Sequence, residues 1–174
     1  ELGFTHYGLS EHSPRLSTSE LFPAEMEGGV EALQRAFREY VTEARTLQER
    51  YADRIEILVG YETEKLPQPH WESVMLGLRE EHGFDYCVGS VHDVSGRWVD
   101  VSEEDTRALA ESRGGRETLQ AEYFDSLAEL VDRLKPEVVG HIDLIRKFDG
   151  MDAQFGADVF QHIERALEAV AQAG

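Results

Sequence analysis

The sequence predicts an α/β fold with a mostly parallel sheet, in one domain spanning residues 1–174. Two observations lead to this class. Four short apolar runs are each followed by a long segment whose apolar residues have helical spacing, and the 41% of hydrophobic residues is ordinary for a globular chain of 174 residues. The alternation is typical both of an open α/β sheet and of part of a barrel, and the pattern alone does not choose between them.

The first half of the chain has the order strand, helix, strand. The first strand ends near Ser10. An amphipathic helix is expected over residues 30–47, where apolar side chains recur every three or four positions. The apolar and β-branched run at 55–59 ends at Gly60 and predicts a buried strand whose end lies near Glu62.

The second half continues the alternation. Periodicity predicts a helix over 71–81 and a strand over 86–91, then a turn at Ser95-Gly96 with a short return through residue 101. A further helix over 119–134 is stopped by Pro136, and 138–140 begins another strand. The helical period returns over 159–170.

The charge restricts the partners. Thirty-five acidic residues against seventeen basic ones give a net charge of −18, which repels nucleic acid and anionic membranes. The chain is therefore expected to bind a small molecule, and an anionic ligand needs local metal ions or a few Arg and Lys. The single cysteine, Cys87, is expected in a buried strand, and its lack of a disulfide partner fits a cytoplasmic setting. The sequence contains no run of about eighteen apolar residues, which is the length that a membrane-spanning helix needs.

Four potential metal ligands follow the four predicted strands: His12, Glu62, His92 and His141. Each alone is more often a capping or half-buried residue, but their joint placement at the end of strands favours a common site. Imidazole nitrogen and carboxylate oxygen suit Zn²⁺, Mn²⁺ or Fe²⁺, and the lack of a cysteine cluster favours a catalytic site over a structural one. A carboxylate can bridge two ions about 3.5–4 Å apart, which makes Glu62 the natural bridge.

The segments around these ligands resemble the motifs of one family. They are residues 8–14 (GLSEHSP), 60–62 (GYE), 85–92 (DYCVGSVH) and 139–143 (VGHID). In order and spacing they are similar to the PHP (polymerase and histidinol phosphatase) family, and the Gly-Ser-Val-His ending at His92 resembles its histidinol-phosphatase branch. The resemblance extends from the first residues to about Phe148.

The resemblance implies a fold, a site and a reaction. The fold is the central part of a distorted (β/α)7 TIM-like barrel. Glu62 is expected to bridge two ions, His92 and His141 to bind the second ion, and His12 to bind a third, so the complete site holds up to three ions of Mn, Zn or Fe. The implied reaction is hydrolysis of L-histidinol phosphate, a phosphate monoester, to L-histidinol and phosphate in histidine biosynthesis.

Two family motifs do not occur in this sequence: the first His-x-His pair and the last Asp-x-His. The interpretation is a central fragment, truncated at both ends, whose own activity is expected to be low. Two alternatives stay open. One is a PHP-family phosphoesterase for nucleotides or DNA ends, and the other is a metal-binding PHP domain without catalysis.

Residues outside the ligand set supply candidates for substrate binding. Arg146 and Lys147 follow the His141 strand and could reach a phosphate, and Arg15 is a further candidate. Asp100 could meet the ammonium group of the substrate, although an Asp in an acidic protein is more often plain surface. The remaining histidines are expected outside the site: His6, His70, His82 and His162.

Overall fold

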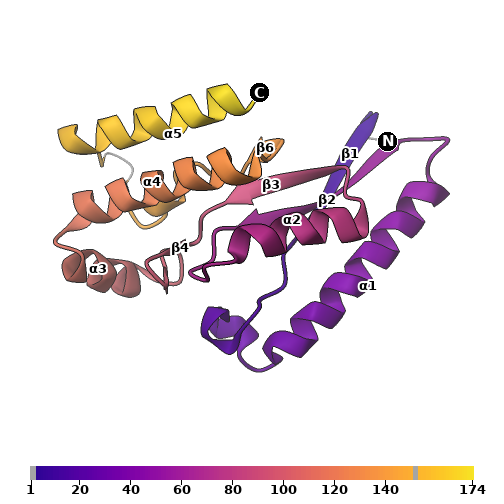
Figure 1. Cartoon of the computed structure of the whole chain (residues 1–174), viewed down its shortest axis with the longest axis horizontal. Helices are drawn as coiled ribbons and strands as arrows, with labels where there is room; N and C mark the ends of the chain where they lie inside the picture. The colour runs from indigo at the N-terminus through magenta and orange to yellow at the C-terminus, as the bar shows by residue number, and fades with distance from the viewer. Residues whose placement is uncertain (1–2, 151–152) are drawn as a thin grey trace.

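A four-stranded parallel sheet forms the centre of the computed structural model, which describes residues 3–150 and 153–174 (Figure 1). The strands are β1 (His6–His12), β2 (Glu56–Glu64), β3 (Tyr86–Ser90) and β6 (Val138–Val139), and they lie side by side in chain order. Each neighbouring pair is parallel. The predicted α/β class and parallel sheet are therefore confirmed, and the order is the one found between consecutive strands of a barrel.

Long helices connect the strands, as predicted. α1 (Gly29–Arg50) joins β1 to β2, α2 (Trp71–His82) joins β2 to β3, α4 (Arg116–Leu134) precedes β6, and α5 (Phe160–Ala173) follows it and lies along α4 (Figure 1). α4 ends where Lys135 adopts a left-handed conformation directly before Pro136, which explains the predicted stop. Among the helices of the described residues, none combines the length and the apolar character that a membrane crossing requires.

The two faces of the sheet carry different side chains. Successive side chains of a strand point to opposite faces, so Val59 and Tyr61 of β2 face away from Glu62 and Glu64. Val59 and Tyr61 are fully buried, and the Tyr61 hydroxyl donates to the carbonyl oxygen of Met75 in α2 at 2.8 Å. The helices thus cover one face, and the two glutamates of β2 belong to the other.

Cys87 lies on the helix-covered face of β3. It is buried and is a free thiol. Burial raises the pKa of this thiol to about 11, so the group stays protonated at neutral pH and behaves as a small apolar side chain. The expectation of a buried strand position is confirmed.

A short hairpin and an additional helix separate β3 from α4. β4 (Asp93–Val94) and β5 (Arg97–Trp98) pair antiparallel across Ser95 and Gly96, which both have positive φ, as two-residue hairpin turns require. The return strand is shorter than predicted and ends at Trp98. The helix α3 (Glu103–Ser112) was not predicted, because it is short and buries only two apolar side chains.

Four short 3-10 turns complete the described structure. They are η1 (Thr18–Glu20), η2 (Pro23–Glu25), η3 (Leu144–Arg146) and η4 (Ala157–Val159). η1 and η2 lie in the segment that follows β1, and η3 lies in the segment that follows β6. Both segments begin at the edge of the sheet where the strands end, so their side chains are placed around that edge.

Candidate metal centre

The four predicted ligands converge at one edge of the sheet. His12 is the last residue of β1 and pairs in register with Glu62 of β2, while His92 and His141 each come two residues after the end of a strand. The Glu62 carboxylate lies at the centre. Its Oε1 is 3.6 Å from Nε2 of His92 and 3.6 Å from Nε2 of His141, and its Oε2 is 3.8 Å from Nε2 of His12. The structure thus brings all four together.

Three of these ligand atoms have the spacing of a single metal site. The Nε2 atoms of His92 and His141 are 2.9 Å apart, and both are 3.6 Å from the same oxygen of Glu62. Bonds of ~2.0–2.1 Å to a tetrahedral ion would place ligand atoms about 3.4 Å apart. The triangle therefore fits one divalent ion without a rearrangement of the backbone.

Charges within the cluster are coupled. Burial raises the pKa of Glu62, but its contacts with His141 and Ser90 and the nearby imidazoles outweigh this effect and lower the pKa overall. The contact with Glu62 in turn raises the pKa of His141, against an opposing effect of burial. Glu62 is thus an ionised carboxylate at neutral pH, which is the form that binds metal.

Backbone hydrogen bonds hold the ligands at this edge. The amide of Ser13, next to His12, donates to the carbonyl oxygen of Glu62 at 2.8 Å. The amide of Val99 donates to the carbonyl oxygen of His92 at 3.0 Å. The hydroxyl of Tyr123, fully buried in α4, donates to the carbonyl oxygen of His141 at 3.2 Å. The loop ligands are therefore tied to neighbouring elements rather than left on free chain.

Glycines let the strands approach closely near the ligands. A Cβ atom at Gly140, directly before His141, would collide with the hydroxyl oxygen of Ser90. A Cβ atom at Gly89 would lie 2.6 Å from Leu130 of α4. The glycines of the Val-Gly-Ser-Val-His and Val-Gly-His segments thus have a packing reason.

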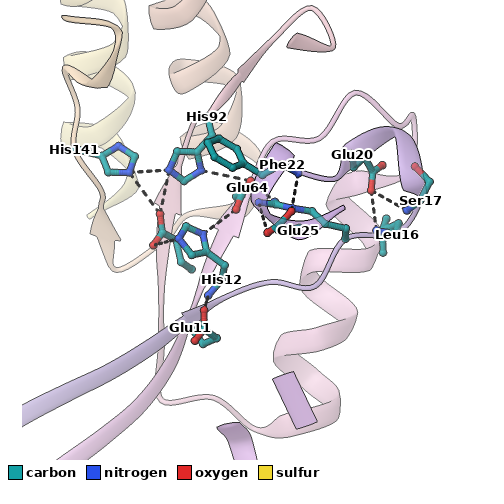
Figure 2. A network of polar contacts seen from close by, with 12 residues as sticks. Glu11, His12, Leu16, Ser17, Glu20, Phe22, Glu25, Glu64, His92 and His141 are labelled. Carbon is teal, nitrogen blue, oxygen red and sulfur yellow. Dashed lines mark hydrogen bonds and ion pairs between the residues drawn. The ribbon is translucent and has the colours of Figure 1, made fainter. Parts of the chain in front are cut away.

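Sequence reasoning missed Glu64, the second glutamate on the site face of β2. Glu64 is 1% exposed, and its Oε1 is 2.9 Å from Nδ1 of His12 while its Oε2 is 3.4 Å from Nδ1 of His92 (Figure 2). Its hydrogen bond with His12 raises the pKa of that imidazole to about 9, against an opposing effect of burial. The available signal was the spacing Glu62-x-Glu64, which puts both carboxylates on one face of a strand.

Arg15 has a different environment from the predicted one. It is 4% exposed, and its guanidinium donates to Oε2 of Glu64 at 2.6 Å and to Oε2 of Glu25 at 3.1 Å. It also stacks over the ring of Trp98 at 4.7 Å. These two carboxylates occupy the donors that a phosphate would need, so the structure speaks against the predicted phosphate contact of Arg15 and ties this residue to Glu64 instead.

The other substrate candidates lie on the segment after His141. Arg146 donates from Nη2 to the carbonyl oxygen of Ala153 at 2.6 Å and lies over the ring of Phe155 at 5.0 Å. Lys147 donates to the backbone oxygen of Asp100 at 2.8 Å, with its ammonium 3.9 Å from the Asp100 carboxylate. Asp100 follows Val99, whose amide donates to the carbonyl oxygen of His92, so this pair lies near the cluster. The contacts of Arg146 and Lys147 given above are with residues other than Glu62.

Three of the remaining histidines have side-chain partners of their own, and His70 is the residue that precedes α2. His6 pairs with Glu56 at 3.1 Å, His162 pairs with Asp125 at 2.9 Å, and His82 packs against the ring of Phe37. Within residues 3–150 and 153–174, both groups of side chains with ligand-like spacing are built only from the cluster around Glu62 and Glu64. This agrees with the expectation that these histidines lie outside the site.

Comparison with known proteins adds a family to this geometry. The family model of the PHP domain matches residues 1–174. A probable histidinol-phosphatase of Schizosaccharomyces pombe is 37% identical over 169 residues, which cover 97% of the chain and 54% of that protein. The histidinol-phosphatase of Saccharomyces cerevisiae is 30% identical over 159 residues, or 84% of the chain and 48% of that protein. The chain thus spans about half the length of these curated relatives.

Two solved structures share the fold. A crystal structure of hisK from Listeria monocytogenes, assigned as a histidinol phosphatase, has a TM-score of 0.81 at 24% identity. The match covers 98% of the chain and 69% of the Listeria monocytogenes chain. The structure of histidinol phosphate phosphatase of Lactococcus lactis, complexed with zinc, L-histidinol and phosphate, has a TM-score of 0.59 at 23% identity. The match covers 79% of the chain and 51% of the Lactococcus lactis chain. At these identities the likeness concerns the fold.

Proposed function

The chain belongs to the PHP domain family, and from this premise we propose that it carries part of the active site of a metal-dependent phosphomonoesterase acting on L-histidinol phosphate. The products are L-histidinol and inorganic phosphate, in histidine biosynthesis. The observation that carries the proposal is the convergence of three imidazole Nε2 atoms on the Glu62 carboxylate, within 3.6–3.8 Å. Such a set of imidazoles and a carboxylate is the donor chemistry of Zn²⁺, Mn²⁺ and Fe²⁺.

Each ligand has a distinct place in the proposed site. Glu62 offers one oxygen to the side of His92 and His141 and the other to the side of His12, so it would bridge neighbouring ions. His92 and His141 would hold one ion with Glu62, and His12 would hold a further ion, with up to three ions in the complete site. When bound, the ions would activate water and neutralise charge on the phosphate. The chain's own residues then supply position and charge.

The choice of substrate is supported by the relatives. Two curated relatives carry the name histidinol-phosphatase, and the Lactococcus lactis protein was solved with zinc, L-histidinol and phosphate. We propose zinc as the first ion to test. The net charge of −18 disfavours the polyanionic alternative, a nucleotide or DNA end. Arg146 remains a candidate for phosphate, because its side chain is 29% exposed and the Asp149 carboxylate lies 3.7 Å from Nε, beyond hydrogen-bond distance.

The test compares substrates in the purified full-length protein. Phosphate release is measured with L-histidinol phosphate and with nucleoside monophosphates, each with zinc and with manganese. We expect kcat/KM to be at least about 100-fold higher for L-histidinol phosphate. A preference for nucleotides would reject the substrate assignment, and metal binding without turnover on either substrate would favour the inactive metal-binding domain.

A further inference from the structure

We propose that Glu64 is a positioning residue that orients two ligand imidazoles at once, by accepting from Nδ1 of His12 and from Nδ1 of His92 so that both Nε2 atoms face Glu62. The inference rests on the proposed metal site, and it assigns Glu64 a place outside the ligand set. Figure 2 shows Glu64 between the rings of His12 and His92, on the side away from His141.

The geometry of the two rings carries the inference. Nδ1 of His12 is 2.9 Å from one oxygen of Glu64, and Nδ1 of His92 is 3.4 Å from the other. The opposite nitrogens, Nε2, lie 3.8 and 3.6 Å from the Glu62 carboxylate. In a metal-binding imidazole, a hydrogen bond from one nitrogen to a carboxylate fixes the tautomer and leaves the lone pair of the other nitrogen for the ion. Glu64 is placed to do this for both rings, since it is hydrogen-bonded to His12 and lies within ion-pair distance of His92.

Arg15 holds the Glu64 carboxylate in its place beside the two rings. Glu64 and Arg15 are 1% and 4% exposed, and the guanidinium donates to Oε2 of Glu64 at 2.6 Å. The guanidinium therefore contacts the same oxygen that faces His92, and the carboxylate is enclosed by Arg15 and the two imidazoles.

The same contacts argue against a competing role for Glu64 as a direct ligand. Its oxygens lie close enough to Nδ1 of His12 and His92 for the three residues to form a possible ion group. An ion there would share Oε2 with the guanidinium of Arg15, which is a buried like charge. It would also occupy the Nδ1 atoms, so the nitrogens that face Glu62 would carry the ring protons and could not bind an ion there. The Nε2 arrangement around Glu62 avoids both costs.

The segment after β1 braces this arrangement from outside. Glu25 accepts from Nε of Arg15 at 3.1 Å and from the amide of Phe22 at 2.7 Å, which ties the arginine to the turn η2 (Figure 2). Trp98 covers the guanidinium at 4.7 Å. Because His12 and His92 belong to different ions in the proposed site, loss of Glu64 is expected to weaken the binding of more than one ion.

The experiment uses the full-length protein with Glu64→Gln. In glutamine an NH₂ donor replaces one of the two carboxylate oxygens, and His12 and His92 face different oxygens, so only one ring still meets an acceptor. The control is Glu20→Gln, because Glu20 is also buried, at 2% exposed, but accepts from the amides of Leu16 and Ser17 rather than from imidazole. Zinc affinity is measured by competition with a chromogenic chelator, zinc content by mass spectrometry, and folding by circular dichroism.

We expect Glu64→Gln to lower zinc affinity about 10- to 100-fold, with zinc content unchanged at saturating metal, and Glu20→Gln to change affinity less than about threefold. A lower zinc content at saturation would identify Glu64 as a ligand and overturn the inference. Unchanged affinity in Glu64→Gln would overturn it as well, while leaving the metal site itself standing. A wild-type protein that binds no zinc would overturn both.

A measurement on the wild-type protein keeps the inference testable if Glu64→Gln does not fold. Long-range ¹H–¹⁵N correlation spectra of the zinc-loaded protein report which ring nitrogen binds metal. His12 and His92 are expected to bind through Nε2 and to carry a proton on Nδ1. Coordination through Nδ1 in either ring would reject the proposed role of Glu64.

Discussion

The Nε2 atoms of His92 and His141 lie 2.9 Å apart, although the residues are 49 positions apart in the chain and follow different strands. Without a metal ion, two imidazole nitrogens at this distance share at most one proton, and both lie 3.6 Å from the same oxygen of Glu62. In the proposed site these are two ligand atoms of one ion, and the first prediction tests this assignment.

Removal of His141 or Glu62 should reduce metal content to different extents. His141→Ala removes one ligand of one ion, and we expect a loss of about one zinc per chain. Glu62→Ala removes the carboxylate that contacts all three imidazoles, so the loss of zinc should be larger in this variant. Turnover should fall by more than about 100-fold in both variants. Metal analysis and phosphate release measure the two effects. The control is His162→Ala, since that ring pairs with Asp125, and unchanged zinc in both site variants would refute the ligand set.

Tyr123→Phe should loosen the His141 segment without removing a ligand. The Tyr123 hydroxyl is buried and donates to the carbonyl oxygen of His141 at 3.2 Å, so its loss leaves that acceptor without this donor. We expect the free energy of unfolding to fall by about 0.5–1.5 kcal/mol and zinc affinity to fall by less than tenfold. Urea unfolding of the metal-free protein and chelator competition test this, with Tyr51→Phe at the end of α1 as the control. A stability equal to that of wild type would contradict the role of this hydrogen bond.

Much of the fold was predictable because its elements have strong periodicity. α1 and α2 begin and end within three residues of their predicted bounds, and the candidate ligands were found because each follows an apolar run. β2 is longer than predicted, since the strand continues past Gly60 to Glu64, where the charged Glu62 and Glu64 alternate with Tyr61 and Thr63. That boundary concealed Glu64, because a carboxylate beyond the end of a strand would have no fixed face.

The environment of Arg15 could not be predicted from sequence. Arginine is rarely buried unless it is paired, and its partners Glu25 and Glu64 lie 10 and 49 positions away. Only the fold brings β1, β2 and the turn η2 together around it. In the same way, α3 buries few apolar side chains, so its main sequence signal was the cap at Ser102, whose hydroxyl accepts from the amide of Asp105 at 3.1 Å.

Gly60→Ala should destabilise the protein through a collision with Tyr86. A Cβ atom at Gly60 would lie 2.6 Å from the ring of Tyr86, which crosses the site face of the sheet from β3. We expect a loss of about 1–3 kcal/mol in the free energy of unfolding. In the background Tyr86→Ala the same substitution should cost at least about 1 kcal/mol less, because the ring is absent.

A double-mutant cycle from urea unfolding gives this coupling. Gly77→Ala in α2 is the control, because a Cβ atom there meets no atom within 4 Å. Equal costs of Gly60→Ala in both backgrounds would show that the ring does not enforce the glycine. In that case the glycine of the Gly-Tyr-Glu segment would need another explanation.

Asp85→Asn should change how stability depends on pH. The Asp85 carboxylate accepts from the amide of Val59 at 2.7 Å and from the side chains of Gln48 and Arg45 at 3.0 Å, and it ties β3 to α1 and β2. Burial raises its pKa, but these three contacts outweigh burial and lower the pKa below the ordinary value of 3.8. A lowered pKa contributes stability above the unfolded value, and this contribution is lost as the pH falls through the folded value.

The difference in the free energy of unfolding between wild type and Asp85→Asn should therefore depend on pH. We expect about 0.5–1.5 kcal/mol at pH 7, since asparagine keeps one acceptor but loses the charge that faces Arg45. At about pH 3 the difference should shrink, because protonation begins to remove the same charge from the wild type. Urea unfolding with a chelator present at both pH values separates this effect from metal release. Asp53→Asn, at an exposed position after α1, is the control, and a difference that grows toward pH 3 would reverse the assigned sign.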